Sequence, residues 1–302
     1  MVRKSLAAVS VALMFHGFAQ ATDAGPADAG PADTGSGATC TCSGAKTEQP
    51  PAGTWAAQGQ LGLIVTSGNT TTKSGNASFN AAHEMGRWTL SGGLAALYAS
   101  SGDYSTQQDT NVNLQADLAL SKRTFWFSTA RWDRNLYSGF AYQESVATGG
   151  GYNFIQTPAT QLAGELGVGY RIESPETLTT GPLGNVTERE LLPGNLQRNA
   201  VLQAGVNYSH AITRLTKVVN TLLVQYGSSD TTTSDNLSLQ VQVDASLSLA
   251  VGVQLVNNSS PPPGSARHTD SVMTVNLVYA LKNPKLSPTA TAPVNVNGFN
   301  LP

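Results

Sequence analysis

The residues of this sequence that could do chemistry are charged groups set at alternate positions in apolar stretches. Arg131 and Asp133 lie two residues apart, as do Arg171 and Glu173, so each pair shares one face of an extended strand. Opposite charges in this arrangement can pair as a brace across the interior of a β-structure, or they can line a water-filled path. We favour the ion-pair brace, with a selectivity ring as the alternative.

The charges that we expect on the interior face are balanced in sign. From the direction of each strand we assign them to three levels: Arg87, Asp117, Lys217 and Asp244 near one end, Glu165 near mid-height, and Arg131, Asp133, Arg171, Glu173 and Arg198 toward the other end. A narrow interior would hold these groups as a plug of ion pairs. If the interior conducts, a balanced lining predicts weak ion preference.

Hydrolytic catalysis is the least favoured interpretation. A serine hydrolase on the outer wall of a barrel needs a serine, a histidine and an orienting polar group. His83 and His210 fall in short turns, where we expect them to be solvated. His268 precedes Asp270 and Ser271, but neighbours in an extended strand do not form a triad by themselves. The sequence therefore predicts no enzyme.

The cysteines do not predict a metal centre. Cys40 and Cys42 are the only two, and a single residue separates them. This spacing does not suit a relaxed mutual disulfide, and two ligands without a nearby histidine make a weak metal site. We interpret them as two linker thiols, with an inter-chain or strained local disulfide as the alternative. We expect neither a metal nor a cofactor.

Strands must position the charged residues, because the sequence alternates with a period of two from Trp55 to Leu281. Apolar and polar residues alternate most clearly over 111–120 and 236–245. The pattern predicts an all-β chain with about twelve antiparallel strands, an even number as a single-chain membrane barrel requires. The expected strands are 55–66, 72–83, 87–99, 111–120, 124–135, 144–154, 161–173, 198–209, 215–226, 235–245, 247–256 and 270–281.

The connections between these strands alternate in length. Long polar loops are expected at 100–110, 136–143, 174–197, 227–234 and 257–269. Tight turns are expected at 84–86, 121–123 and 211–214, and the tip at 67–70 is a short turn on the long-loop side. Short turns at one end and long loops at the other are typical of outer-membrane barrels.

Aromatic residues cluster near both ends of the expected strands. Trp88 and Tyr98 share an apolar face ten residues apart, which at the usual rise and tilt spans roughly 25 Å along a membrane normal. That span matches the apolar band between two aromatic girdles, whereas the strands of a soluble β-sandwich are shorter. The predicted girdle residues are Trp88, Tyr98, Tyr152, Phe154, Tyr170, Tyr208, Tyr226 and Tyr279.

The ends of the chain predict export and two segments outside the barrel. Residues 1–21 hold Arg3 and Lys4, a short apolar stretch and a small-residue cleavage site, as a secretory signal peptide does. We expect 22–54 to be a disordered periplasmic linker rich in Asp, Ala, Gly and Pro, 55–281 the barrel, and 282–302 a periplasmic tail. With 12% charged residues and a net charge of −2, the composition gives no reason to expect a nucleic-acid partner.

Several motifs resemble a known family. Gly59-Gln-Leu-Gly62 leading into Thr66-Ser-Gly-Asn-Thr70, then Arg131-Trp-Asp-Arg134 and Pro261-Pro-Pro-Gly264, resemble the salt-induced outer-membrane proteins of the YdiY-like family over about 55–281. The resemblance implies an outer-membrane barrel but no catalytic residues, because the family is a domain of unknown function. The chain departs from the family in continuing past Leu281 rather than ending on a terminal Phe.

Three functional hypotheses follow from the sequence. The first is a narrow channel for small solutes or ions in the bacterial outer membrane, with both chain ends in the periplasm. The second is a structural or partner-binding envelope barrel with an occluded lumen, which would use the 174–197 loop and the linker to meet partners. The third is the outer-wall hydrolase. In each case the expected partners are outer-membrane lipid and, during insertion, the barrel-assembly machinery.

Overall fold

The structure, a computed structural model, describes residues 54–66, 72–102, 104–181, 186–191, 196–261 and 268–281. The predicted signal peptide, Cys40, Cys42, nearly all of the 22–54 linker and the 282–302 tail lie outside these residues. The described strands are β1 (Thr54–Thr66), β2 (Thr72–Met85), β3 (Trp88–Ser101), β4 (Tyr104–Ala119), β5 (Thr124–Asn135), β6 (Phe140–Gln156), β7 (Thr160–Thr180), β8 (Val186–Leu191), β9 (Gln197–Ala211), β10 (Thr216–Gly227), β11 (Thr231–Gln242), β12 (Leu247–Asn258) and β13 (Thr269–Leu281).

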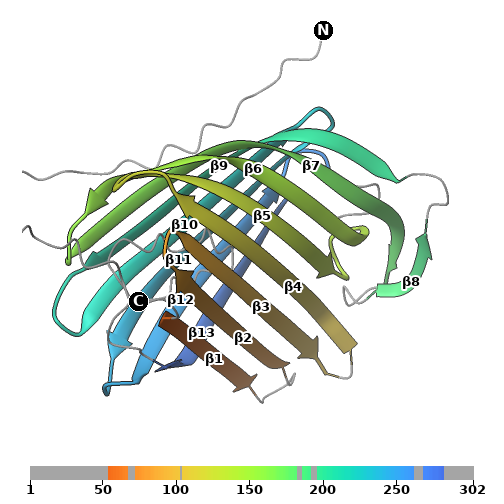
Figure 1. The fold of residues 1–302 in the computed structure, drawn as a ribbon. Helices are drawn as coiled ribbons and strands as arrows, with labels where there is room; N and C mark the ends of the chain where they lie inside the picture. Colours follow the sequence, from red (N-terminus) through yellow and green to blue (C-terminus); the bar gives the residue numbers. More distant parts are fainter. Residues whose placement is uncertain are drawn as a thin grey trace, which may run out of the picture. The chain divides into compact units, whose positions relative to one another are not determined.

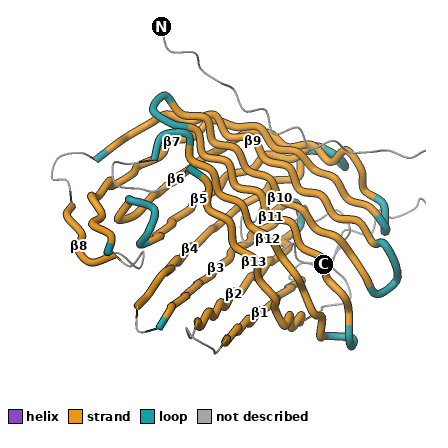
Figure 2. Tube along the Cα trace, turned by 180° about the vertical axis from the view of Figure 1, so that it is seen from behind, coloured by secondary structure: helices purple, strands orange, loops and turns teal. Residues whose placement is uncertain are grey.

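All of these strands except β8 form a closed antiparallel barrel. Each strand pairs with its neighbours in chain order, β9 pairs with β7, and the seam between β1 and β13 completes the ring. The strands are strongly tilted and run side by side around the wall (Figures 1 and 2). The predicted all-β barrel of about twelve antiparallel strands is confirmed, with twelve strands in the ring.

The even strand number brings both ends of the barrel sequence to the same rim. Ala57 near the start of β1 pairs with Leu281 at the end of β13. We call this rim the inner end and the opposite rim, where β8 lies, the outer end. At the inner end, β2 and β3 are joined by two residues, and Gly86 supplies the positive φ (62°) that such a tight hairpin requires.

The strands extend further toward the outer end than the sequence pattern predicts. β4 begins at Tyr104 rather than 111, β6 at Phe140 rather than 144, β11 at Thr231 rather than 235, and β7 continues to Thr180. The predicted long loops at 100–110, 136–143 and 227–234 are therefore wrong, and much of 174–197 is the β7–β8 hairpin. The hydrogen bonds between paired strands are made by backbone groups, so the strands continue where the side chains are polar on both faces.

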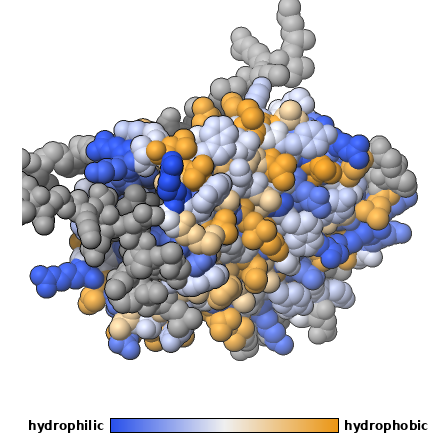
Figure 3. Space-filling model, viewed as in Figure 1, coloured by the Kyte–Doolittle hydropathy of each residue, from blue (hydrophilic) through white to orange (hydrophobic). Residues whose placement is uncertain are grey.

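The outer wall of the barrel is apolar. Every one of the twelve barrel strands carries at least one large hydrophobic side chain that is exposed, for example Leu114 in β4, Leu166 in β7 and Leu277 in β13. Figure 3 shows such side chains spread over the visible face, with hydrophilic ones nearer its margins. Among the described residues, no helix has the length and hydropathy needed to cross a membrane.

Candidate functional site

One face of every barrel strand points into the lumen, and β5 shows what that face carries. The buried residues Phe125, Phe127, Thr129 and Arg131 alternate with exposed ones along the strand. Asp133, the next position in this series, is half-buried near the outer end. The lumen face of β5 therefore changes from aromatic near the inner end to charged near the outer end.

Glycines of the next two strands make room for the lumenal phenylalanines. Phe125 and Phe127 pack with Ala147 as a buried cluster. A methyl group at Gly151 of β6 would overlap the ring of Phe125, and one at Gly167 of β7 would press on the ring of Phe127. Packed rings therefore fill part of the inner half of the lumen on this side.

The outer half of the lumen contains a cavity of about 580 Å³, which we call the outer vestibule. This volume lies within the range of about 300–1,000 Å³ that small-molecule sites usually have. Residues from β4 to β7 and from β10 to β13 line it, and its polar and charged lining includes Asp109, Asn111, Arg131, Asp133, Gln143, Arg171, Gln225, Gln254, His268 and Asp270.

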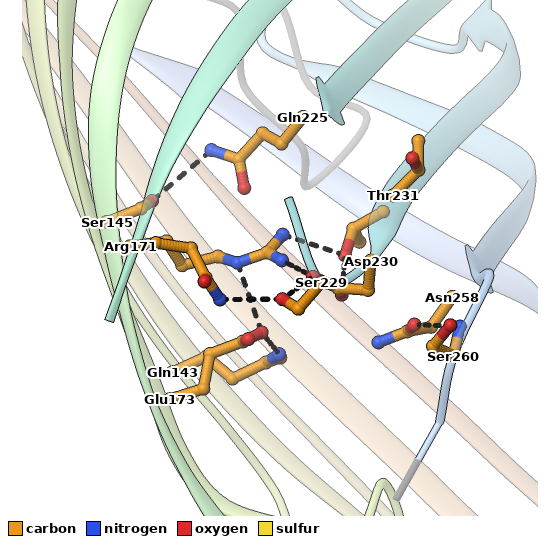
Figure 4. Close-up of polar contacts among 12 residues, drawn as sticks. Gln143, Ser145, Arg171, Glu173, Gln225, Ser229, Asp230, Thr231, Asn258 and Ser260 are labelled. Atoms are coloured by element: carbon orange, nitrogen blue, oxygen red, sulfur yellow. Dashed lines mark hydrogen bonds and ion pairs between the residues drawn. The ribbon is translucent and has the colours of Figure 1, made fainter. Parts of the chain in front are cut away.

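An ion-pair cluster around Arg171 closes one side of the vestibule (Figure 4). Arg171 is 2% exposed. Its Nε lies 3.1 Å from Glu173 Oε1, its Nη2 pairs with the carboxylate of Asp230, and its Nη1 donates to Thr232 Oγ1 at 3.0 Å. Gln143 Nε2 donates to Glu173 Oε1 at 2.6 Å. The cluster ties β6 and β7 to the turn between β10 and β11, so here the charges act as a brace.

Arg131 lies among carboxylates on the other side of the vestibule. It is 7% exposed and attracts both Asp133 and Glu165. Asp109 is close enough to Asp133 and Asp270 for mutual electrostatic repulsion. The vestibule therefore brings together acidic groups from β4, β5 and β13 around a single arginine of β5.

A layer of uncharged polar side chains, which we call the waist, fills the lumen below the vestibule. Its members are each at most 7% exposed, and they are Gln58, Gln60, Ser78, Asn80, Asn113, Gln115, Gln203, Thr221, Ser238, Gln240 and Asn276. Some of them pair with each other or with charged neighbours. Asn76 Nδ2 donates to Asn276 Oδ1 at 2.8 Å, and Gln115 Nε2 donates to Asp117 Oδ1 at 2.9 Å and to Glu165 Oε1 at 3.1 Å.

Other polar atoms of the waist are buried without a hydrogen-bond partner in the described part of the chain. They are Gln58 Nε2, Gln60 Nε2, Ser78 Oγ, Thr221 Oγ1, Ser238 Oγ and Gln240 Nε2. Buried polar groups are nearly always paired with protein or with ordered water, because an unpaired one is costly. These atoms are therefore suited to contact water or a polar solute in the lumen.

The structure brings together only part of the charge set predicted for the interior. Asp117, Arg131, Glu165, Arg171 and Glu173 are buried in the lumen, and Asp133 and Lys217 are half-buried. The remaining three, Arg87, Arg198 and Asp244, are exposed.

The exposed positions of Arg87, Arg198 and Asp244 correct the prediction that positive and negative charges are balanced in the lumen. Arg87 and Asp244 lie in inner turns, and Arg198 lies on the face of β9 that alternates with the buried Val201 and Gln203. Polarity at a strand end does not identify the inward face, because water wets both faces there. The charges that the sequence reasoning missed are mostly acidic, namely Glu84, Asp109, Asp230 and Asp270. Asp109 could have been found by continuing the alternation of β4 back from Asn111.

The predicted girdle residues lie on the outer wall, and all of them except Tyr170, which lies at the middle of β7, are near a strand end. Trp88, Tyr98, Tyr152, Phe154, Tyr170, Tyr226 and Tyr279 are exposed, and Tyr208 is half-buried. Trp55 and Trp126 are also exposed on this wall and were not predicted. Trp55 stacks on His83 with ring centroids 4.1 Å apart, which places that histidine against an aromatic ring.

The other two histidines also have ordinary contacts. His210 Nδ1 lies 2.8 Å from Thr160 Oγ1, and His268 Nδ1 lies 3.1 Å from the backbone oxygen of Asn258. Among the described residues, no group of three His, Cys, Asp or Glu side chains could hold a metal ion.

A family model described as "Protein of unknown function, DUF481" matches residues 59–281. The chain is also 25% identical over 224 residues to the "Uncharacterized protein YdiY" of Escherichia coli (strain K12), covering 73% of this chain and 81% of that protein.

Three solved structures are similar to the barrel at low sequence identity. The NanC porin is 8% identical, with a TM-score of 0.43 over 76% of this chain and 100% of that chain. The COG4313 outer membrane channel from Pseudomonas putida F1 is 12% identical, with a TM-score of 0.43 over 78% and 98%. The translocator domain of autotransporter NalP from Neisseria meningitidis is 13% identical, with a TM-score of 0.42 over 74% and 87%.

Proposed function

We propose that this chain, which belongs to the DUF481 family of proteins of unknown function, forms a narrow hydrated channel for small polar solutes or ions in the bacterial outer membrane. The fold is a closed antiparallel barrel of the outer-membrane type. Exposed apolar side chains on all twelve barrel strands support a lipid environment, since such a continuous apolar surface is unfavourable in water.

The unpaired polar atoms of the waist carry the proposal. A barrel that is only a scaffold can fill its interior with apolar side chains or with polar groups that satisfy one another. Here amide and hydroxyl groups such as Gln60 Nε2, Thr221 Oγ1 and Ser238 Oγ face the lumen without a hydrogen-bond partner in the part of the chain that the structure describes. A column of water, or a polar solute moving through it, satisfies these groups in turn.

The side chains of the waist keep the path narrow. Thr221 and Gln203 are at most 1% exposed, so a solute must displace side chains or move among them as they change rotamer. The vestibule above is wide enough to collect a small solute before this step. The expected behaviour is a small conductance with a steep dependence on solute size.

A structural barrel is the second candidate, and the Arg171 cluster favours it. Three charged groups are buried there in contact with each other, and together they tie the wall to an outer turn. If the waist is equally fixed, the lumen does not conduct and the exposed β8 edge becomes the natural surface for an envelope partner.

Planar-bilayer recording on the refolded protein separates the two candidates. The channel proposal predicts small unitary conductance steps, and Thr221→Phe in the waist should reduce them at least about twofold by filling the path. The matched control Leu222→Phe lies on the outward face of the same strand and should conduct like the parent chain. Folding of each variant is checked by its heat-modifiable gel migration. A folded parent chain with no conductance at any voltage supports the structural barrel instead.

The cellular placement belongs to the same proposal. Cleavage of the 1–21 signal, insertion by the barrel-assembly machinery and a periplasmic position for both chain ends are expected together, because the inner end carries both ends of the barrel sequence. Protease digestion of intact cells tests this placement. The outer β7–β8 hairpin should be cleaved, whereas the inner turn at 243–246 should be protected.

A further inference from the structure

The buried charges of the barrel are predominantly acidic. Among the described residues, eight charged side chains are buried, and six of these are acidic and two basic. The acidic ones are Glu84, Asp117, Glu165, Glu173, Glu176 and Asp230, and the basic ones are Arg131 and Arg171. Glu176 is balanced by Arg189 of β8, whose Nη1 lies 3.7 Å from Glu176 Oε1. The other buried charges are still mostly acidic, which differs from the balanced lining that the sequence pattern predicts.

The two buried arginines are already engaged by carboxylates. Arg171 contacts both Glu173 and Asp230. Arg131 attracts Asp133 and Glu165. Each arginine thus faces two acidic groups, so neither leaves an excess of positive charge to attract an anion.

Further carboxylates line the route that a solute would take. Asp109, Asp133 and Asp270 all line the vestibule, and Asp109 is close enough to the other two for electrostatic repulsion. Deeper in the lumen, Asp117 Oδ2 and Glu165 Oε2 are buried without a hydrogen-bond partner among the residues that the structure describes, and each residue is at most 5% exposed. Carboxylate oxygens without donors are positions where a cation or its hydration water is stabilised.

We infer that the vestibule and the lumen below it admit small cations in preference to anions. A cavity lined by one sign of charge and enclosed by a low-dielectric wall focuses the field and concentrates counter-ions. The inference rests on the proposed channel, because it names the class of solute that the channel would pass.

Reversal potentials across a bilayer with a salt gradient test the inference. The parent chain should show a K⁺ to Cl⁻ permeability ratio above about 3, and the double variant Asp109→Asn/Asp133→Asn should lower that ratio at least about twofold. The matched control Glu188→Gln removes an exposed carboxylate of β8 outside the vestibule and should leave the ratio unchanged. A conducting parent chain with a ratio at or below 1 overturns the inference but not the channel.

The rate of thiol modification reports on the electrostatic field of the vestibule even if the barrel does not conduct. In a full-length chain carrying Cys40→Ser and Cys42→Ser, the variant Asn258→Cys places a thiol in the vestibule lining. A cationic methanethiosulfonate reagent should modify it at least about threefold faster than an anionic one, after correction by the exposed β8 variant Thr187→Cys. A corrected ratio at or below 1 overturns the inference. If the corrected ratio of modification rates is high but the barrel does not conduct, the cation preference of the vestibule stands and only the channel proposal fails.

Discussion

The two sides of the lumen are built from different chemistry. On β4, β5 and β7, which we call the charged side, the buried residues include Asp117, Arg131, Glu165 and Arg171, together with Phe125 and Phe127. On β1, β2, β11 and β13, which we call the amide side, the residues of the waist are Gln, Asn and Ser. The charged side is held by ion pairs and ring packing, although Asp117 Oδ2 and Glu165 Oε2 have no donor among the described residues. On the amide side, the groups without a hydrogen-bond partner in the described chain are amides and hydroxyls.

This difference indicates which side holds the shape of the lumen and which side contributes little to its stability. Groups that satisfy each other gain rigidity from their contacts, and removing one partner leaves a buried charge uncompensated. Groups without protein partners must exchange with water, so they can also exchange with a passing solute. The comparison predicts large stability effects on the charged side and small ones on the amide side.

The largest expected effect is that of Arg171→Met. The substitution leaves Glu173 and Asp230 buried without their cation, and a broken buried ion pair typically costs about 3–5 kcal/mol. Urea unfolding in lipid vesicles, followed by tryptophan fluorescence, measures the loss. Arg198→Met is the control, because Arg198 is exposed on the outer face of β9 and its loss should matter little. Equal stability of the two variants would show that the cluster is not a brace.

Phe127→Ala should come next on the charged side. Phe127 is fully buried against Ala147, and truncating a packed phenylalanine typically costs about 3 kcal/mol or more. The same unfolding assay measures it, with the exposed Trp126→Ala as the neighbouring control on the outer wall. A loss no larger than that of the control would mean that the ring does not support the wall.

The sequence predicts the barrel well because apolar and polar residues alternate along each strand, and the two faces of the strand have different surroundings. Along 111–120 an apolar residue faces lipid at every second position, and the polar residues between face the lumen. This signal fades where the wall leaves the apolar band. Residues 104–110 continue β4 with polar side chains on both faces, so their strand character is not visible in the pattern.

The candidate site is less predictable than the barrel because the alternation fades near the outer end, and because the site joins residues that are far apart in the sequence. Arg171 and Glu173 could be paired from their spacing alone. Their partner Asp230 lies in the turn between β10 and β11, and only the folded barrel brings that turn next to them. The amide residues of the waist, such as Gln60 and Gln240, look like ordinary polar positions of a strand. Only the packing of opposite walls shows that they are buried and which of their atoms lack a partner.

A moderate loss of stability is expected from a polar pair that lies on the outer wall rather than on either side of the lumen. Asn220 of β10 donates to Asp235 Oδ1 of β11 at 2.6 Å, on the face that also carries Leu222 and Leu237. Asn220→Leu leaves Asp235 without this donor on an apolar wall, which should cost about 1–3 kcal/mol. Adding Asp235→Leu should recover most of that loss, because the double variant presents only apolar groups. A double variant as unstable as the single one would show that the pair has a role beyond its own hydrogen bond.

The smallest stability effect is expected from Ser238→Ala on the amide side together with Thr221→Val on the neighbouring strand β10. Neither hydroxyl has a hydrogen-bond partner among the described residues, so removing both should change the free energy of unfolding by less than about 1 kcal/mol, or raise it. The conductance should nevertheless fall, because the path loses groups that hold water against the wall. Bilayer recording beside the unfolding assay separates the two effects. If stability falls as far as in Arg171→Met, these hydroxyls belong to the packed framework and the two sides do not differ in role.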